Sequence, residues 1–305
     1  GETCAAFEAT EQAKVLPSID LICQSMLDAG INRSSVLIAM GGGITGDVGG
    51  YAAASYMRGI RYVQVPTTLL AMVDASVGGK TGVNIQGDDG VLLKNMIGAF
   101  WQPSLVVADV ATLQTLDDRH MRCGIAECIK HALLGNSELL TMLEQKRETI
   151  MSRDESTLVD LVTLSASIKA SIVEEDEKET GVRALLNLGH TFAHAIEPIP
   201  ELGLYHGEAV AIGLCAAAAL SEAMELIDAS QVHFVRSLVK EYQLPTVLPK
   251  SQSSTMLMKR MQSDKKHSGA KNRFVVMTEN GAQIAEDVSE QLVALAWASV
   301  GGQLV

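Results

Sequence analysis

The stretch "SSVLIAMGGGITGDVGGYAAASYMRGIRYVQVP", residues 34–66, decides the fold class. It opens with a short apolar run, 34–40, which is typical of a buried strand and ends at three glycines, Gly41–Gly43. Residues 46–57 predict a helix with small residues on its packing face, and residues 61–66 predict a second strand. A strand, a glycine turn, a helix and a strand form a βαβ unit, which predicts a Rossmann-like parallel sheet.

The sequence pattern changes near residue 112. A third strand is expected over 104–109, but beyond it only 273–278 has a strand-like pattern. The later helical patterns cover residues 118–134, 137–151, 155–177, 183–197, 206–226, 229–242 and 287–299. We therefore expect an α/β domain over residues 1–112 and a mostly α-helical domain over residues 113–305.

Composition limits the partners of this chain. Its 305 residues are 47% apolar and carry a net charge of −12, which argues against nucleic-acid binding because phosphate backbones need a basic surface. Five scattered cysteines without a CxxC pair indicate reduced thiols. No long apolar run free of polar residues stands out, so we expect no membrane partner. The chain opens mid-pattern without a methionine, and we expect its natural N-terminus to be missing.

Two glycine-containing segments are candidate phosphate sites. Gly41–Gly43 precede a predicted helix, whose N-terminal N–H groups attract anions, although a plain tight turn has the same composition. Asp47 in that helix is either a dipole partner or a cofactor contact. The segment 78–81 lacks the first glycine of a Walker A motif, because position 74 is Asp74 in an apolar helical pattern. Two lysines and an asparagine near this segment form either a basic pocket for an anion or a solvated surface. They are Lys80, Lys94 and Asn95.

Histidines gather in one stretch of the helical half. His190 and His194 share a predicted helix face, and His206 follows a proline-containing loop. Glu127 and His131 lie four residues apart on another predicted helix. One carboxylate with two imidazoles is a common open zinc set. The spacing leaves open which three of these five residues bind a metal, and whether the histidines only pack a core.

Taken together, the motifs resemble one family, 3-dehydroquinate synthase. The resemblance rests on segment 41–84 with its "GGGITGDVGG" and "VGGKTGVN", and on "KNMIGAFWQP", "GIAECIKHALL", "RALLNLGHTFAHAIE", "HGEAVAIG" and "DKK". These pieces occur in the family's order across most of residues 11–270.

The resemblance implies an NAD-binding α/β domain followed by a helical metal-binding domain. It implies conversion of 3-deoxy-D-arabino-heptulosonate 7-phosphate into 3-dehydroquinate and phosphate. The implied steps are transient oxidation by NAD, phosphate elimination, re-reduction and intramolecular aldol closure, with Zn²⁺ or Co²⁺ as the metal. It also implies a homodimer and a cytoplasmic location, or a plastid if the missing N-terminus carried a transit peptide.

Site roles follow from the same resemblance. The implied zinc ligands are Glu127, His190 and His206. Catalytic roles fall to Lys80, Lys130, Lys169, Glu179, Arg183, Asn187 and His194, the last as a polar or proton-handling group. Substrate contacts fall to Arg58, which reaches a neighbouring subunit's substrate, and to Asp74, Lys94, Asn95 and one of Lys265 and Lys266 in a polar loop. Cofactor contacts fall to Glu11, Lys14, Gly42, Gly43, Asp47, Thr67, Thr68 and Thr115.

The sequence departs from the family pattern in two places that matter. We expect this chain to lack the family's first βα segment, which builds part of the adenosine site, and this puts its NAD binding in question. The segment between Lys80 and Lys94 is longer than usual, and we expect it to displace Lys94 and Asn95.

Three other functions share many of these features. A sister sugar-phosphate cyclase of the valiolone or inosose type has the same cofactors, but Lys169 and Asn187 match the dehydroquinate-forming pattern. A metal-dependent polyol dehydrogenase would accumulate NADH. An inactive fragment would bind neither zinc nor NAD.

Overall fold

The computed structural model describes residues 3–87, 92–268 and 273–303 and divides into two compact units, Gly1–Asp117 and Asp118–Val305. The domain boundary expected after residue 112 falls inside η3 (Val110–Thr115), a 3₁₀ helix with buried Val110 and Leu113, and the α/β unit continues to Asp117.

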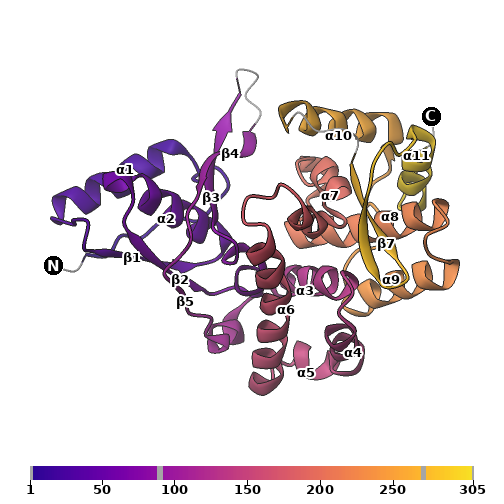
Figure 1. Ribbon diagram of the computed structural model, residues 1–305, viewed down its shortest axis with the longest axis horizontal. Helices are drawn as coiled ribbons and strands as arrows, with labels where there is room; N and C mark the ends of the chain where they lie inside the picture. Colours follow the sequence, from indigo (N-terminus) through magenta and orange to yellow (C-terminus); the bar gives the residue numbers. More distant parts are fainter. Residues whose placement is uncertain (1–2, 88–91, 269–272, 304–305) are drawn as a thin grey trace. The chain divides into compact units, whose positions relative to one another are not determined.

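A parallel sheet forms the centre of the first unit (Figure 1). Its strand order is β1 (Val36–Gly41), β2 (Arg61–Pro66) and β5 (Leu105–Val106). The crossover helix α2 (Gly43–Ser55) joins β1 to β2 and packs on both strands. This is the Rossmann-like βαβ arrangement that the opening stretch predicts.

Small residues allow α2 to lie close to the sheet. A Cβ on Gly49 would come within 2.7 Å of the Ala39 Cβ, and a Cβ on Gly50 within 2.5 Å of the Thr81 side chain. Both contacts are too short for any residue but glycine, so these positions fix the distance between helix and sheet. The core beneath them includes Val48 and Tyr62, both almost fully buried.

The first unit also contains a hairpin that the sequence pattern did not reveal. β3 (Lys80–Gln86) and β4 (Leu92–Phe100) are antiparallel, with a register shift between Val83 and Ile85. Strands are recognised by alternating apolar and polar residues. In this hairpin the bulge shifts the alternation, and glycine and polar residues interrupt it further. The unit also contains α1 (Leu16–Asp28), η1 (Tyr56–Arg58) and η2 (Ala71–Ala75). Asp74 lies in η2, a short π-helical turn whose other residues are apolar, as its helical pattern predicts.

The second unit is mostly helical. Its helices are α3 (Asp118–Leu133), α4 (Ser137–Gln145), α5 (Arg147–Met151), α6 (Glu155–Glu175), η4 (Val182–Asn187), α7 (His190–Ile196), η5 (Pro200–Leu202), α8 (His206–Ala223), α9 (Ala229–Glu241), α10 (Ser254–Ser268) and α11 (Glu290–Ser299). Side-chain caps fix the starts of α4, α6, α9 and α11, because the side chains of Asn136, Asp154, Asp228 and Ser289 accept backbone N–H groups. The helix expected over 183–197 is instead η4 and α7, separated by Gly189 at a φ of +78°.

Helix α8 is the centre of this unit (Figure 1) and contacts α3, α7, α9, α11 and β7. Its residues from Ala209 to Ala218 are buried on every face, which alanine permits because it needs little space. The strands of this unit are short: β7 (Phe274–Thr278) pairs with β8 (Gly281–Ala285), and β6 (Gln252–Ser253) with β9 (Gly302–Gln303).

Two helices differ from their sequence-based interpretation. Lys265 and Lys266 lie on α10 and not in a polar loop, since buried Leu257 and Met261 hold one face of that helix. Among the described helices, α6 alone is long and apolar enough to cross a membrane by length and composition. Core helices meet the same criteria, and α6 packs against α3, α4 and η4.

Candidate active site and metal centre

A carboxylate and two imidazoles converge inside the helical unit. Glu127 projects from α3, His190 is the first residue of α7, and His206 is the first residue of α8. Glu127 Oε1 lies 3.2 Å from His206 Nε2 and 3.5 Å from His190 Nε2. One donor atom from each of the three residues lies within 4.8 Å of the others.

These separations fit a divalent ion. Zinc bonds of 2.0–2.1 Å in tetrahedral geometry place neighbouring ligand atoms about 3.3 Å apart. The two measured distances, 3.2 and 3.5 Å, bracket that value. Three protein ligands leave one position for water or substrate, which is the arrangement of a catalytic centre.

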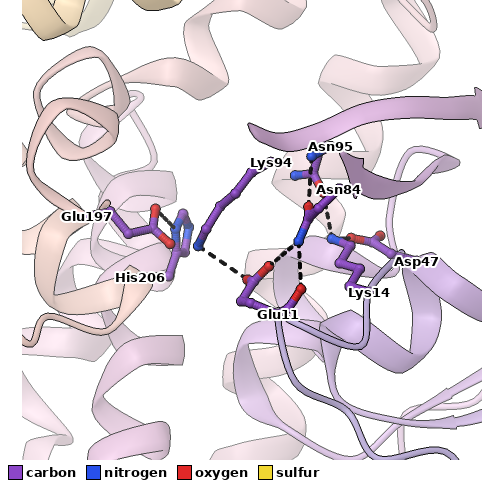
Figure 2. A network of polar contacts seen from close by, with 8 residues as sticks. All are labelled: Glu11, Lys14, Asp47, Asn84, Lys94, Asn95, Glu197 and His206. Atoms are coloured by element: carbon purple, nitrogen blue, oxygen red, sulfur yellow. Dashed lines mark hydrogen bonds and ion pairs between the residues drawn. The ribbon is translucent and has the colours of Figure 1, made fainter. Parts of the chain in front are cut away.

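The ring nitrogens that face away from the convergence point have hydrogen-bond acceptors. His190 Nδ1 lies 3.2 Å from the Leu188 carbonyl, and His206 Nδ1 lies 3.2 Å from Glu197 Oε2 (Figure 2). A protonated Nδ1 that donates to these oxygens leaves Nε2 as the ligand atom, and such outer partners are typical of metal-bound histidines. Glu197 is the C-cap of α7 and was not singled out from the sequence.

Charges around the centre favour a cation. Lys130 Nζ contacts the other oxygen of Glu127, Oε2, at 2.6 Å. Burial and the Lys130 ammonium lower the pKa of His190, which keeps that imidazole neutral. Burial also opposes protonation of His206, but hydrogen bonds to Glu127 and Glu197 outweigh it and raise the pKa of His206 to about 10. A metal ion at Nε2 would replace the proton that faces Glu127, while the Nδ1 proton keeps its contact with Glu197.

The two remaining candidate histidines have different surroundings. His131 is buried, and its Nδ1 lies 2.8 Å from Ser165 Oγ on α6. His194 is exposed, and its ring lies edge-on to His190 with the centroids 5.6 Å apart. His194 is thus next to the ligand set without belonging to it.

The segment before α7 carries three predicted catalytic residues. Its shape depends on Asp176, whose carboxylate accepts N–H groups of Thr180, Gly181 and Arg183 at 2.7–3.1 Å. Arg183 is fully buried and donates to the Glu177 carbonyl. Two further contacts complete the segment: Asn187 Nδ2 donates to Glu179 Oε1 at 2.8 Å, and Glu179 adopts a φ of +59°.

Three further lysines of the predicted site belong to the helical unit. Lys169 is buried on α6, which packs against η4. The side chains of Lys265 and Lys266 lie outside the described residues.

The glycine turn of the first unit starts helix α2 without side chains of its own. α2 begins at Gly43, and its N-cap Gly42 offers no side chain to the first N–H groups. A Cβ at Gly42 would come within 3.3 Å of Thr68, and one at Gly43 within 3.2 Å of Ala75. The N-terminus of a 13-residue helix with such close neighbours fits a pyrophosphate approached by backbone N–H groups.

A polar network joins the hairpin to the chain segment before α1 (Figure 2). Lys14 is buried and donates to Asp47 Oδ2 at 2.5 Å and to Asn95 Oδ1 at 2.6 Å. Glu11 accepts from Asn84 Nδ2 at 2.8 Å and from Lys94 Nζ at 3.2 Å. Residues expected to contact the cofactor are thus bonded to residues expected to contact the substrate.

Asn84 links both halves of that network and was missed in the sequence. It is almost fully buried at the hairpin's register shift, and its Oδ1 accepts the Asn95 N–H at 2.9 Å. Asn95 has a φ of +56°. A buried asparagine beside a bulge has no periodic signature, so only its position in "TGVN" marks it.

Other predicted residues of this unit are dispersed. Lys80 begins β3 opposite Phe100, whereas Lys94 follows Leu93, the partner of Ile85, so Lys80 lies at the other end of the hairpin from Lys94 and Asn95. Thr68 Oγ1 accepts the Ala71 N–H at 3.2 Å and Thr67 donates its N–H to the Gly41 carbonyl. Exposed positions are Arg58, with a φ of +66°, and Thr115 in η3.

Comparison with known proteins identifies the family. The model described as "3-dehydroquinate synthase N-terminal" matches residues 4–123, and "3-dehydroquinate synthase C-terminal" matches residues 124–267. The chain belongs to the 3-dehydroquinate synthase family. The 3-dehydroquinate synthase of Nitrosospira multiformis is 47% identical over 280 residues, which are 91% of this chain and 75% of that protein. That of Acidithiobacillus ferrooxidans is 46% identical, over 90% of this chain and 74% of the relative.

Solved structures of related cyclases have the same fold as this 3-dehydroquinate synthase family member. The 2-epi-5-epi-valiolone synthase of Streptomyces hygroscopicus, solved with NAD⁺ and Zn²⁺ bound, is 28% identical with a TM-score of 0.88 and covers 96% of this chain and 81% of its own. A 2-deoxy-scyllo-inosose synthase is 25% identical with a TM-score of 0.80 and covers 94% and 80%. A probable glycerol dehydrogenase from Sinorhizobium meliloti, 15% identical with a TM-score of 0.61 over 94% and 82%, shares the fold alone.

Proposed function

We propose that this enzyme converts 3-deoxy-D-arabino-heptulosonate 7-phosphate into 3-dehydroquinate and inorganic phosphate. The observation that carries the proposal is the convergence of Glu127, His190 and His206 at spacings suited to a divalent ion. Relatives named for this activity at 44–47% identity support it.

The residues that would hold the metal are Glu127, His190 and His206. When bound, Zn²⁺ or Co²⁺ supplies Lewis-acid polarisation of a substrate oxygen, and NAD supplies reversible hydride transfer. Lys130 holds Glu127 Oε2, which leaves Oε1 to face the imidazoles. His194, exposed beside His190, is placed to hold a proton at a ring nitrogen near the substrate.

Cations of the helical unit suit a substrate with a carboxylate and a phosphate. Lys130, Lys169 and Arg183 lie in the same unit as the metal ligands, and Lys and Arg side chains bind carboxylates and phosphates through charge-assisted hydrogen bonds. We assign them to the substrate's anionic groups, with the Glu179–Asn187 pair binding its hydroxyls. Asp74, Lys80, Arg58 and one of Lys265 and Lys266 stay assigned to substrate through the family resemblance.

The residues that would hold NAD belong to the first unit. The Gly42–Gly43 turn and the N-terminus of α2 would bind the pyrophosphate, with Thr67 and Thr68 beside it. Asp47, Lys14 and Glu11 already form one network with Asn84, so we assign the ribose hydroxyls to these side chains. Thr115 keeps its assigned cofactor role on the family resemblance.

The test is an assay for 3-dehydroquinate with the heptulosonate phosphate, NAD and zinc, with and without a chelator. We expect equimolar phosphate and 3-dehydroquinate, loss of turnover with chelator, and recovery with Zn²⁺ or Co²⁺. NADH should not accumulate, because the hydride returns to the product. Net NADH formation would instead indicate a dehydrogenase, and no turnover with no metal bound would indicate an inactive chain.

A sister cyclase of the valiolone or inosose type is the second candidate, since solved cyclases of these types share the fold at 25–28% identity. A panel of sugar phosphates with phosphate release as the readout separates the candidates. We expect release from the heptulosonate phosphate only. Faster release from another sugar phosphate of the panel would replace the first assignment.

We also assign the enzyme to a cytoplasmic homodimer without membrane or nucleic-acid partners. Five free cysteines and bacterial relatives support the location. The exposed Arg58 supports the dimer if it serves the neighbouring site. Mixing inactive Arg58→Ala and His190→Asn chains should restore activity, because one site of the mixed dimer keeps both residues. Light scattering at the monomer mass, or no restoration, would contradict the dimer.

A further inference from the structure

Helix α8 is pressed against α3 at the residue that follows His206. A Cβ on Gly207 would come within 2.3 Å of Cys123 Cα and 2.5 Å of the Cys123 carbonyl oxygen. No side chain fits there, so the first turn of α8 rests directly on the α3 backbone. The helix that carries Glu127 and the helix that begins with His206 thus touch next to the metal centre.

Arg119 reinforces this contact from the surface. Its Nε and Nη2 donate to Glu208 Oε1 and Oε2, each at 2.7 Å, in a two-point ion pair between α3 and α8. Nη2 also donates to the Gly203 carbonyl at 2.7 Å. The guanidinium lies over the Tyr205 ring, 3.7 Å from its centroid. One side chain of α3 therefore holds the turn before α8 and the first turn of α8 together.

Glu208 completes the arrangement on the α8 side. Its Oε2 accepts the Tyr205 N–H at 2.8 Å, so the residue before His206 is fixed to the residue two after it. Burial opposes the charge of Glu208, but hydrogen bonds from Arg119 and the Tyr205 N–H lower its pKa. The backbone on both sides of His206 is thereby tied to α3.

We propose that the Arg119–Glu208 pair is a positioning device for the metal centre, which sets the location of His206 relative to Glu127 without touching the ion. Glu127 follows Arg119 by eight residues of α3, about 12 Å along the helix axis. A small rotation of the first turn of α8 would move the imidazole away from the carboxylate.

The Arg119–Glu208 pair should affect metal affinity more than the global stability of the fold. The Arg119 side chain is 41% exposed, and exposed ion pairs contribute little to global stability. Outer partners of metal ligands, in contrast, change metal affinity by about 10–100-fold. Because Arg119 acts through the α8 backbone, we place its effect at the lower end, about tenfold.

The inference rests on the proposed function, because it takes Glu127, His190 and His206 as the metal ligands. The experiment measures zinc affinity of the metal-free full chain by competition with a fluorescent zinc indicator. It also records the visible absorption of the Co²⁺-loaded chain, which reports ligand geometry. Variants are Arg119→Ala and Glu208→Gln, and helix content is checked by circular dichroism.

Arg153→Ala is the matched control. Arg153 Nη2 contacts Asp118 Oδ1 at 2.6 Å, so this variant removes an arginine–carboxylate pair that links α3 to the segment before α6 and does not involve α8. We expect Arg119→Ala to bind zinc about tenfold more weakly with altered Co²⁺ absorption. Glu208→Gln keeps an acceptor for the Tyr205 N–H and should lose less, and Arg153→Ala should match the parent chain.

Unchanged zinc affinity and Co²⁺ spectra in folded Arg119→Ala and Glu208→Gln chains would overturn the inference alone. An equal loss in Arg153→Ala would also overturn it, since any weakening of α3 would then suffice. If Arg119→Ala does not fold, Glu208→Gln decides. A parent chain that binds no zinc overturns the proposed function and this inference together, which separates the two failures.

Discussion

At the scale of single residues, both ring nitrogens of His190 have polar partners, which a histidine that only packs a core would not need. It is buried, its Nδ1 is directed at a backbone carbonyl and its Nε2 at Glu127. A histidine that only fills space can be replaced by asparagine at modest cost.

We expect His190→Asn to lose bound zinc and turnover while its helices stay formed, because the amide cannot reach the place of Nε2. Metal analysis and circular dichroism of the purified variant check this. His233→Asn, on an exposed position of α9, is the control. Stoichiometric zinc in His190→Asn would remove the ligand assignment.

Cysteine residues give a second prediction at this scale. Burial raises the pKa of Cys123 to about 11 and of Cys215 to about 12, and Cys128 is also buried. A raised thiol pKa means less thiolate at any given pH, and the thiolate is the reactive form.

At pH 8 we therefore expect a disulfide reagent to modify exposed Cys4 rapidly and half-buried Cys23 more slowly. The other three thiols should react only in denaturant. The measurement is the thiol count against time, with and without urea. Fast modification of all five thiols in the native chain would contradict the structure of the helical core.

At the scale of elements, the packing of α7 on α8 depends on a glycine in each helix region. A Cβ on Gly213 would come within 2.2 Å of the Gly189 carbonyl oxygen, and Gly189 itself has a positive φ. α7 begins with His190, so this close approach also locates a metal ligand.

Gly213→Ala should therefore destabilise the helical unit by about 1–3 kcal/mol, the usual cost of overpacking, and weaken zinc binding. Gly46→Ala is the control, since its Cβ would meet only the end of the Gln64 side chain at 3.0 Å, which can move. Urea unfolding measures the stability of the two variants. Equal stability of the two variants would show that α7 can retreat from α8 without cost.

The elements also show what sequence patterns can predict. The βαβ unit and the long helices were predicted because their apolar periods are regular. The β3–β4 hairpin was not, because a bulge at Asn84 interrupts its alternation. The spacing of the five candidate ligands could not predict that Glu127, His190 and His206 converge, because chain spacing does not say which helices meet. Glu197, Glu208 and Arg119 could not be predicted as neighbours of His206, because only tertiary contacts bring them to it.

At the scale of the whole molecule, two compact units each carry one of the two tryptophans. Trp101 belongs to the first unit, where its Nε1 donates to the Ile60 carbonyl. Trp297 is fully buried in the second, against Phe192. Fluorescence of single-tryptophan variants therefore reports each unit separately.

Ligands should stabilise the units selectively. In Trp101→Phe, zinc at 100 times its Kd should raise the stability reported by Trp297 by about 2.7 kcal/mol, because the ion binds only the folded unit. In Trp297→Phe, NAD and not zinc should shift the Trp101 signal. Urea unfolding with each ligand is the measurement. A zinc shift that appears first at Trp101 would place the metal in the wrong unit.

The distance along the chain between the ligands has a consequence for how the enzyme matures. Glu127 and His206 are separated by 79 residues and meet only when three helices have assembled. During synthesis the ribosome must therefore release the chain through His206, about half of the second unit, before all three residues can meet. The folded helices, and not the nascent chain, would therefore bind the ion from the surrounding pool. The metal content of a purified sample thus records the supply in the cell that made it.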